Sequence, residues 1–144
     1  MIIKQISAFV ENKSNGVSEI AKILAAGGVD IRALSIADTT EFGILRMIVS
    51  DTELAQNLLS SAGISVKTTS VLAAAVPDSP GGLAGALELL SENGINIEYI
   101  YAFIGGEDKG ALVVFKADDQ AKAEEILKSS TLPQISAEDI LRSR

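Results

Sequence analysis

Residues 76–103, VPDSPGGLAGALELLSENGINIEYIYAF, are the part of the sequence that decides the fold. Pro80, Gly81 and Gly82 predict a sharp turn, because proline fixes φ and glycine permits positive φ. Leucines then recur at helical spacing, and the pair Asn93-Gly94 is typical of a helix end. A β-rich run follows that glycine. The stretch therefore predicts a strand end, a tight loop, one amphipathic helix and a second strand.

The order of predicted elements occurs twice along the chain. Gly16 precedes Gly82 by 66 residues, and apolar positions of the two predicted helices match at the same offset. The second half gains one residue in its hairpin, after which Asp51 matches Asp118. Few residues are identical, but the order of elements is the same throughout. The pattern indicates an internal duplication.

Each half reads strand, helix, strand, strand, helix, strand, which is the split βαβ, or ferredoxin-like, arrangement. We expect an α+β protein of two ferredoxin-like βαββαβ units in tandem. Each unit would have an antiparallel four-stranded sheet with two helices on one face. The halves meet in one long β-prone run that is interrupted only by polar residues at 68–70. The two domains are therefore expected at residues 1–69 and 70–144.

The composition favours binding over catalysis. With 144 residues, 47% of them hydrophobic, the chain can bury a core. It has no cysteine and no histidine, so it lacks thiolate nucleophiles, the commonest general base and the commonest zinc ligands. A net charge of -7 argues against nucleic acid as a partner. We therefore expect a protein that is not an enzyme and that holds neither a cofactor nor a metal.

The sequence also predicts where the protein works. It has neither an apolar run of the ~18 residues that a membrane span needs nor an N-terminal signal peptide. Met1 is followed at once by strand-like residues. We expect a cytoplasmic protein with no membrane partner.

The loop ahead of the second-half helix has two interpretations. Free amides near Gly81, Gly82 and Leu83 could bind a carboxylate or a phosphate, with Asp78 close to an amine. Alternatively, the loop is an ordinary helix start with Asp78 or Ser79 as N-cap. The matching loop of the first half keeps short polar side chains and the last glycine, and its candidate ligand-binding residues are Asn12, Ser14, Asn15, Gly16 and Val17. Retention of the pattern in both halves favours a ligand site.

Two strands carry further candidate residues. Arg32 and Glu98 occupy matching positions, and an arginine there could bind a carboxylate through two hydrogen bonds, although a solvated strand face is the commoner role. Tyr99 and Tyr101 share one face of their strand and either fill an interface or contact a ligand. The run around them is apolar on both faces, so we expect a packed partner and a homodimer.

The residues DSPGGLAGALELLSENGINIEYIYAF resemble the signature of the ACT domain, and ENKSNGVSEIAKILAAGGVDIRALSIAD is similar to a more diverged copy. The most specific part is the D-x-P-G-x-L loop, which stands here as Asp78, Pro80, Gly81 and Leu83. The first copy departs from it, with Asn12, Ser14, Asn15 and Val17 at those positions. Together with the hairpins and the second helices, the resemblance covers essentially the whole chain as a tandem pair.

The resemblance implies modules that bind amino acids or similar small effectors and that regulate. The amino acid would lie between the first loop of one copy and the second strand of another, near Arg32 or Glu98. Alternatively, the chain is a regulatory or interaction subunit of a separately encoded amino-acid biosynthetic enzyme, without a ligand of its own. An RNA-binding use of the same topology would need basic charge and exposed aromatic residues, and only the two tyrosines favour it.

Overall fold

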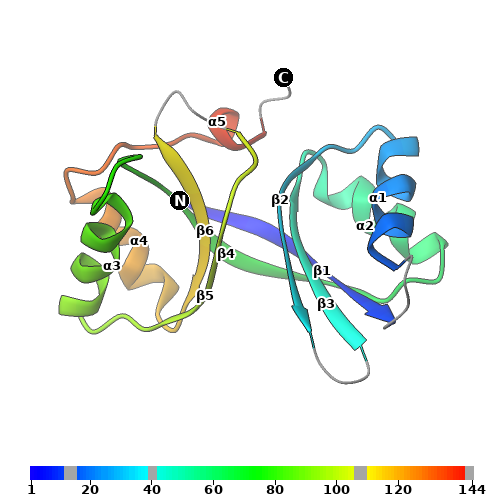
Figure 1. Ribbon diagram of the computed structural model, residues 1–144, viewed down its shortest axis with the longest axis horizontal. Helices are drawn as coiled ribbons and strands as arrows, with labels where there is room; N and C mark the ends of the chain where they lie inside the picture. The colour runs from blue at the N-terminus through cyan, green and yellow to red at the C-terminus, as the bar shows by residue number, and fades with distance from the viewer. Residues whose placement is uncertain (12–15, 39–41, 106–109, 142–144) are drawn as a thin grey trace. The chain divides into compact units, whose positions relative to one another are not determined.

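The computed structural model describes residues 1–11, 16–38, 42–105 and 110–141 (Figure 1). In these residues the chain forms six strands and five helices. The pairs β1–β3, β2–β3, β4–β6 and β5–β6 are antiparallel. The α+β class and the antiparallel strands that the sequence predicts are therefore confirmed. Hydrogen bonds link the strands in the order β2-β3-β1-β4-β6-β5.

The chain divides into two compact units that share its two longest strands. The first-half unit holds Lys4–Thr69 and takes in Leu141. The second-half unit holds Ser70–Ile140 and takes in Met1–Ile3. Strands β1, Ile2–Glu11, and β4, Val66–Val76, each give one end to either unit.

The first-half unit has the element order that its sequence predicts. Besides its parts of β1 and β4, it contains α1 at Gly16–Ala26, β2 at Ile31–Asp38, β3 at Phe42–Val49 and α2 at Thr52–Ser61. β3 pairs with β1 and with β2, both antiparallel. The amide of Phe9 donates to the carbonyl oxygen of Ser65 at 3.0 Å, so the start of β4 lies on the other side of β1. The resulting order is β2-β3-β1-β4, as in a split βαβ unit.

The core of the first-half unit lies between one face of these strands and both helices. Alternate residues of β1 and β3 meet the apolar stripes of α1 and α2 because side chains on a strand point to opposite faces in turn. The buried cluster consists of Ile6, Ala8, Val10, Ile20, Leu24, Val29, Leu45, Met47, Val49, Ala55 and Leu59. Burial of these side chains stabilises the unit, by about 25 cal/mol for each Å² of apolar surface that is removed from water.

The second-half unit differs from its predicted form in one strand. It contains α3 at Gly82–Glu92, β5 at Ile97–Ala102, β6 at Ala111–Ala117, α4 at Gln120–Lys128 and α5 at Ala137–Leu141. The described residues 129–136, which follow α4, form no strand, although the repeat predicts one. The start of the chain takes that place: the amide of Ala73 donates to Met1 O at 2.8 Å, and the Met1 nitrogen donates back at 3.2 Å. Pro133 has no N–H for a strand ladder there, which favours this exchange.

The core of the second-half unit is built like the first. Its buried cluster consists of Leu72, Ala74, Val76, Ala86, Leu90, Ile95, Val113, Phe115, Ala117, Ala123 and Leu127. Every residue from Val71 to Val76 is buried, so this end of β4 is buried on both faces. The sequence predicted such burial for β5, but β5 lies at the end of the strand order and is only half-buried.

Three helices end in the same way. Gly28, Gly63 and Gly94 have φ between 75° and 81°, just beyond α1, α2 and α3. In each case the next residue donates its amide to a carbonyl oxygen five residues back, as Val29 does to Leu24 at 2.9 Å and Ile95 to Leu90 at 3.0 Å. This is the Schellman arrangement, in which glycine takes the left-handed conformation that other residues avoid.

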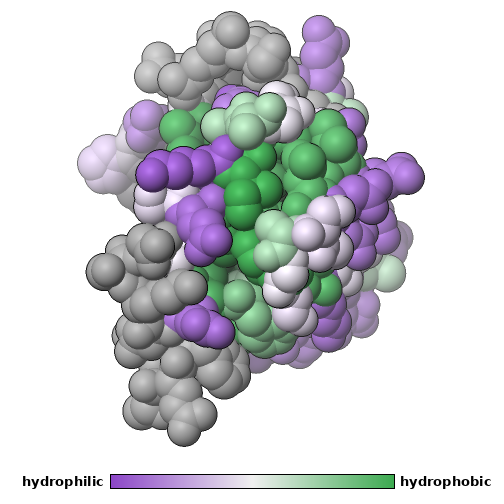
Figure 2. Space-filling view, turned by 90° about the vertical axis from the view of Figure 1, so that its right-hand side faces the viewer, coloured by the Kyte–Doolittle hydropathy of each residue, from purple (hydrophilic) through white to green (hydrophobic). Residues whose placement is uncertain are grey.

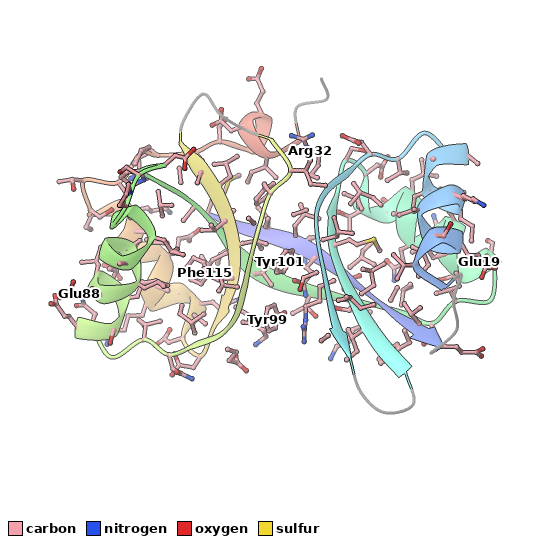
Figure 3. The ribbon with its side chains drawn as sticks, viewed as in Figure 1. Glu19, Arg32, Glu88, Tyr99, Tyr101 and Phe115 are labelled. Carbon is pink, nitrogen blue, oxygen red and sulfur yellow. The ribbon has the colours of Figure 1, made fainter. Side chains whose placement is uncertain are left out.

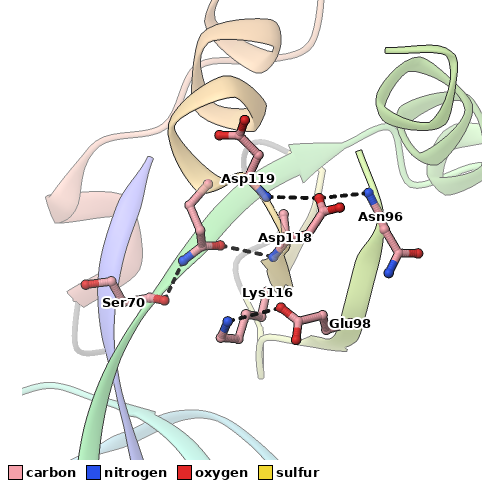
Figure 4. Close-up of polar contacts among 8 residues, drawn as sticks. Ser70, Asn96, Glu98, Lys116, Asp118 and Asp119 are labelled. Carbon is pink, nitrogen blue, oxygen red and sulfur yellow. Dashed lines mark hydrogen bonds and ion pairs between the residues drawn. The ribbon is translucent and has the colours of Figure 1, made fainter. Parts of the chain in front are cut away.

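The aspartates before α2 and α4 correct one detail of the predicted repeat. Asp51 Oδ1 accepts from the amide of Leu54 at 3.1 Å, and Asp119 Oδ1 accepts from that of Lys122 at 3.1 Å. The N-caps therefore pair Asp51 with Asp119, not with Asp118. Asp118 instead accepts from the amides of Asn96 and Asp119 at 3.0 and 2.9 Å (Figure 4).

Candidate functional site

A cavity of about 470 Å³ lies where β1 ends and α1 begins. The described residues that line it belong to the first-half unit: Phe9, Val10, Glu11, Gly16, Glu19, Ile20, Ala62, Gly63, Ile64 and Ser65. Figure 2 views the side on which α1 and α2 lie, and it shows hydrophobic surface bordered by hydrophilic residues there. The volume is within the range of small-molecule sites.

The fold explains why the cavity forms at this place. The α2–β4 connection is brought beside the end of β1 because the amide of Phe9 pairs with the carbonyl of Ser65. The left-handed glycine Gly63 turns the chain out of α2 towards that contact. α1 approaches β1 closely on the other side, since a Cβ on Gly16 would lie 2.4 Å from Val10 Cγ1. The cavity is the space between these two approaches.

The candidate residues of the first loop are only partly described. Asn12, Ser14 and Asn15 lie outside the described residues. Gly16 is buried and lines the cavity, while Val17 is exposed on the first turn of α1. Their role in binding a ligand stays a prediction.

The second loop surrounds the start of α3. Asp78, Ser79 and Gly81 are exposed, Gly82 is half-buried, and Leu83 is 41% exposed. The amide of Gly82 donates to Ser79 O at 3.0 Å. A Cβ on Gly82 would lie 1.9 Å from the carbonyl oxygen of Pro77, so backbone approaches backbone here without room for any side chain.

The start of α3 has no side-chain cap among the described residues. Its N-cap is Gly81 with φ 89°, and no side chain accepts a bond from the first turn. The prediction that Asp78 or Ser79 caps this helix is therefore wrong, because the left-handed glycine sets the turn one step later. α2 and α4, by contrast, are capped by aspartates. The first amides of α3 remain open to an outside acceptor.

Arg32 and Glu98 form ion pairs within their own units. The Arg32 side chain is 6% exposed, and its Nη1 lies 3.2 Å from Asp30 Oδ2. Glu98 lies on β5 and accepts from Lys116 Nζ on β6 at 3.0 Å (Figure 4). Figure 3 shows Arg32 near the start of β2, and Arg32 is not among the residues that line the cavity. The ion pairs give both side chains a structural role, and their ligand contact stays a prediction.

The two tyrosines stack on each other. Tyr99 and Tyr101 project from β5, with ring centroids 6.4 Å apart and planes 24° apart (Figure 3). Both are half-buried. Their mutual packing accounts for their spacing in the strand without a ligand.

Sequence reasoning missed one wall of the cavity. Nothing singled out Phe9, Glu11, Glu19 or the connection Ala62–Ser65. The signal was present in the predicted topology, because a split βαβ unit places its fourth strand beside its first. Because these two strands are antiparallel neighbours, the residues just before β4 are expected beside the end of β1.

No group of three or more Asp, Glu, His or Cys that could hold a metal occurs in the described part of the chain. Within the same residues, no helix is long and apolar enough to cross a membrane.

Comparison with known proteins matches nearly the whole chain. The family model "ACT domain pair" matches residues 1–143. Protein BT0572 from Bacteroides thetaiotaomicron is 37% identical, with a TM-score of 0.90 over 99% of this chain and 98% of that chain. The ligand-free regulatory subunit of aspartate kinase from Thermus thermophilus is 14% identical, with a TM-score of 0.63 over 89% and 91% of the two chains, which shows a shared fold. The comparison with curated proteins found no match.

Proposed function

The chain belongs to the ACT domain pair family, and from this premise we propose that it is a regulatory protein that binds an amino acid at the start of α1. A pair of ACT domains is a regulatory small-molecule-binding module, which agrees with the absence of histidine and cysteine. We assign the two ACT-like domains to residues 1–69 and 70–144, each with its own core. The first is a βαββαβ unit, and the second takes Met1–Ile3 in place of its last strand.

One observation carries the proposal. The cavity beside Gly16 lies at the loop between first strand and first helix, and its volume suits a small molecule. The positive end of the α1 dipole favours a carboxylate there. Gly16 allows the helix to begin close to β1, so the pocket has a firm floor at Val10. A zwitterionic amino acid fits this surrounding better than a purely apolar molecule does.

The loop before α3 is a second candidate for the carboxylate. Its first-turn amides lack a side-chain cap, and Gly81, Gly82 and Leu83 surround them. Asp78 is exposed nearby and could meet the ammonium group. The described residues beside Gly16 line a cavity that matches an amino acid in volume, so we place the principal site at α1.

The first test is a thermal-shift screen of the purified protein against the common amino acids. A ligand at 100 times its Kd should add about 2.7 kcal/mol of stability. Calorimetry on the best ligand should then be repeated with Ala62→Trp, which places a large ring at the rim of the cavity from an exposed position with ordinary backbone angles. We expect at least tenfold weaker binding and unchanged folding.

Ser61→Trp is the matched control. Ser61 is the neighbouring exposed residue at the end of α2 and does not line the cavity, so its variant should bind as the parent does. Unchanged binding by Ala62→Trp would move the site away from α1. If no amino acid stabilises the protein at all, the alternative of a regulatory subunit without its own ligand is favoured, acting on a metabolic enzyme.

We also propose that a second copy of the chain covers the edge of β2. Leu34 and Ile36 are 39% and 53% exposed on one face of this strand, which ends the strand order. Exposed apolar side chains on an edge strand are typical of an interface. Light scattering should give a dimer, and Ile36→Lys should give a monomer. Leu54→Lys, at an exposed leucine of α2 in the same unit, is the control and should remain dimeric.

A further inference from the structure

We propose that the groove between α3 and α4 is a docking site for an amphipathic helix of a partner protein, one with basic residues beside its apolar side chains. The groove belongs to the second-half unit and has a volume of about 420 Å³ (Figure 1). The described residues that line it are Leu89, Asn93, Lys122, Glu125, Ile126, Ser129 and Ser130. None of them lines the cavity at the start of α1, so this inference goes beyond amino-acid binding and does not depend on it.

The first-half unit shows how the corresponding place between two helices can be closed. A Cβ on Gly27 would lie 2.3 Å from Leu58 Cδ1, so α1 and α2 pack together there. The matching residues of the second-half unit are Asn93, which also precedes a left-handed glycine, and Ile126, which is also the seventh residue of its helix. Asn93 has a side chain where Gly27 has none, and its Nδ2 donates to Leu89 O at 2.8 Å. The groove thus lies where one copy of the repeat has a glycine and the other an asparagine.

The groove has an apolar centre and a polar border. Leu89 and Ile126 are half-buried, and Ile126 packs against the core of the second-half unit. Asn93, Glu125 and Ser129 are exposed around them. An apolar strip with a polar border between two helices is the kind of surface that receives the apolar face of a third helix.

The charges on α3 determine which helix fits. Glu88 and Glu92 are the chain neighbours of Leu89 and Asn93, both are exposed, and Figure 3 shows Glu88 projecting outward. Like charges four residues apart destabilise a helix, and a carboxylate in the last turn is unfavourable beside the negative end of the helix dipole. The last turn of α3 has no basic residue, and neither glutamate forms an ion pair among the described residues. The folded chain gains nothing from this pair of charges, but basic residues of a partner would neutralise both.

The exposed charges of α4 do not reverse this balance. Glu125 lines the groove together with Lys122, three residues before it. Lys128 is paired with Glu124 at 3.6 Å. With the two glutamates of α3, the groove therefore has an excess of negative charge. A basic helix would be attracted to it, whereas an acidic partner, including a second copy of this chain with its net charge of -7, would be repelled.

Fluorescence anisotropy with three labelled synthetic peptides tests the proposal. Each is about 15 residues long, enough to form a helix. The first carries leucines at helical spacing with lysines beside them, the second has glutamate in place of each lysine, and the third has serine in place of each leucine. We expect the first to bind, the second not to bind, and the third to bind at least tenfold more weakly. Equal binding of the first and third peptides would show attraction by charge alone and would overturn the proposal.

A variant that fills the groove locates the binding. Ser129 is the exposed C-cap of α4 and lines the groove, so Ser129→Trp should weaken binding of the first peptide at least tenfold. Ser91→Trp is the matched control, because Ser91 is exposed on α3 and is not among the lining residues. NMR shift changes caused by the peptide in the parent protein should centre on Leu89, Asn93 and Ile126. Shift changes centred elsewhere, or equal losses in the two tryptophan variants, would contradict the proposed site.

Glu92→Lys separates docking from a structural role of the glutamate. A lysine in the last turn suits the helix dipole and removes the repulsion from Glu88, so the melting temperature should rise. Binding of the first peptide should nevertheless become about tenfold weaker, because an attraction turns into a repulsion. Glu53→Lys makes the same change of charge at an exposed residue of α2 and should bind as the parent does. Unchanged binding by Glu92→Lys would overturn the charge selection and the proposal with it.

Two further measurements distinguish other occupants of the groove. If Ser129→Trp turns a dimer into a monomer by light scattering, a second copy covers the groove and the proposal is wrong. If an amino acid found in the thermal-shift screen loses affinity with Ser129→Trp but not with Ala62→Trp, the groove holds a small molecule and the proposal is again wrong. Failure of the screen itself would refute the proposed function and leave the docking site standing. Circular dichroism of each variant confirms that it is folded.

Discussion

The first helices of the two units occupy matching places in the repeat but begin in different ways. α1 begins at Gly16, which packs against a side chain of β1, and a cavity lies beside it. α3 begins after a left-handed Gly81, and its Gly82 packs against the backbone of Pro77. Glycine at the same position of the repeat thus allows contact with a side chain in one unit and with the backbone in the other. The difference teaches that a repeated sequence pattern preserves the turn, while the neighbour of each glycine decides what the loop can hold.

The largest expected effect is at Gly82. Gly82→Ala would bring Cβ to 1.9 Å from Pro77 O, and a backbone oxygen cannot move aside as a side chain can. We expect a loss of on the order of 3 kcal/mol in the free energy of unfolding, measured as a lower urea midpoint at unchanged slope. A loss below about 1 kcal/mol would show that the loop before α3 adapts, and the contrast between the two helix starts would then disappear.

Gly16→Ala should cost less, about 1–2 kcal/mol. The clash is with the Val10 side chain at 2.4 Å and with Glu11 O at 3.2 Å, so most of the strain can be relieved by removing the valine methyl groups. The double variant Gly16→Ala, Val10→Ala should therefore be less destabilised than the sum of the two single variants. Strict additivity in a double-mutant cycle would contradict the packing that separates α1 from α3.

Much of the structure of the two units could be predicted from the sequence, because it depends on residues close together in the chain. Glycines, prolines and helical spacing determine the turn at Pro80, the stops at Gly28 and Gly94, and the order of elements. The α+β class follows from that order. The N-cap of α3 could not be predicted, because aspartate, serine and glycine at residues 78–81 all fit a helix start, and backbone angles decide among them. Long-range pairing also escaped prediction: Pro133 argues against a strand at residues 129–136, but no local pattern shows that Met1 pairs with Ala73 instead.

The cavity lies beside one of the two loops singled out from the sequence, but most of its lining residues were not among the candidates, and its binding role stays a prediction. Gly16 was a candidate because it is a glycine at the start of a predicted helix. The wall formed by Ala62–Ser65 is brought there by a strand pairing across more than fifty residues of sequence, which local patterns do not contain. Conversely, Arg32 and Glu98 have the chemistry of ligand-binding residues, but each has found an ion-pair partner close by.

Gly85→Ala sharpens the comparison from the opposite direction. Gly85 is exposed within α3, and a Cβ there would meet nothing within 4 Å. Alanine in a helix is favoured over glycine because the unfolded chain has less freedom to lose, so we expect a gain of about 0.5–1 kcal/mol. A higher melting temperature with unchanged amino-acid affinity would support both the helix assignment and a principal site at α1. Destabilisation would indicate that Gly85 does not lie within α3.

The smallest expected effect concerns Met1–Ile3, the piece of β1 that the second-half unit takes from the start of the chain. In the second-half unit, the Met1 amino group lies in a half-buried position beside Ala73 O, and burial lowers its pKa below the ordinary value of 8.0. Glu124, 3.8 Å away, opposes this shift. Since the unfolded chain then binds more protons than the folded one, stability should rise as pH increases from below the folded pKa to about 8, and level off above it.

Titration of the Met1 amino group by NMR measures its pKa, and urea midpoints over the same pH range measure the stability. Glu124→Gln removes the attraction that raises the pKa, so it should lower the pKa further and steepen the rise, whereas Lys128→Gln should do the reverse. The Met1 amino group could instead titrate at its ordinary pKa, with urea midpoints that do not change between pH 6 and 8. That result would show that Met1–Ile3 is not held against β4, so that the second-half unit would have one strand fewer than the first-half unit.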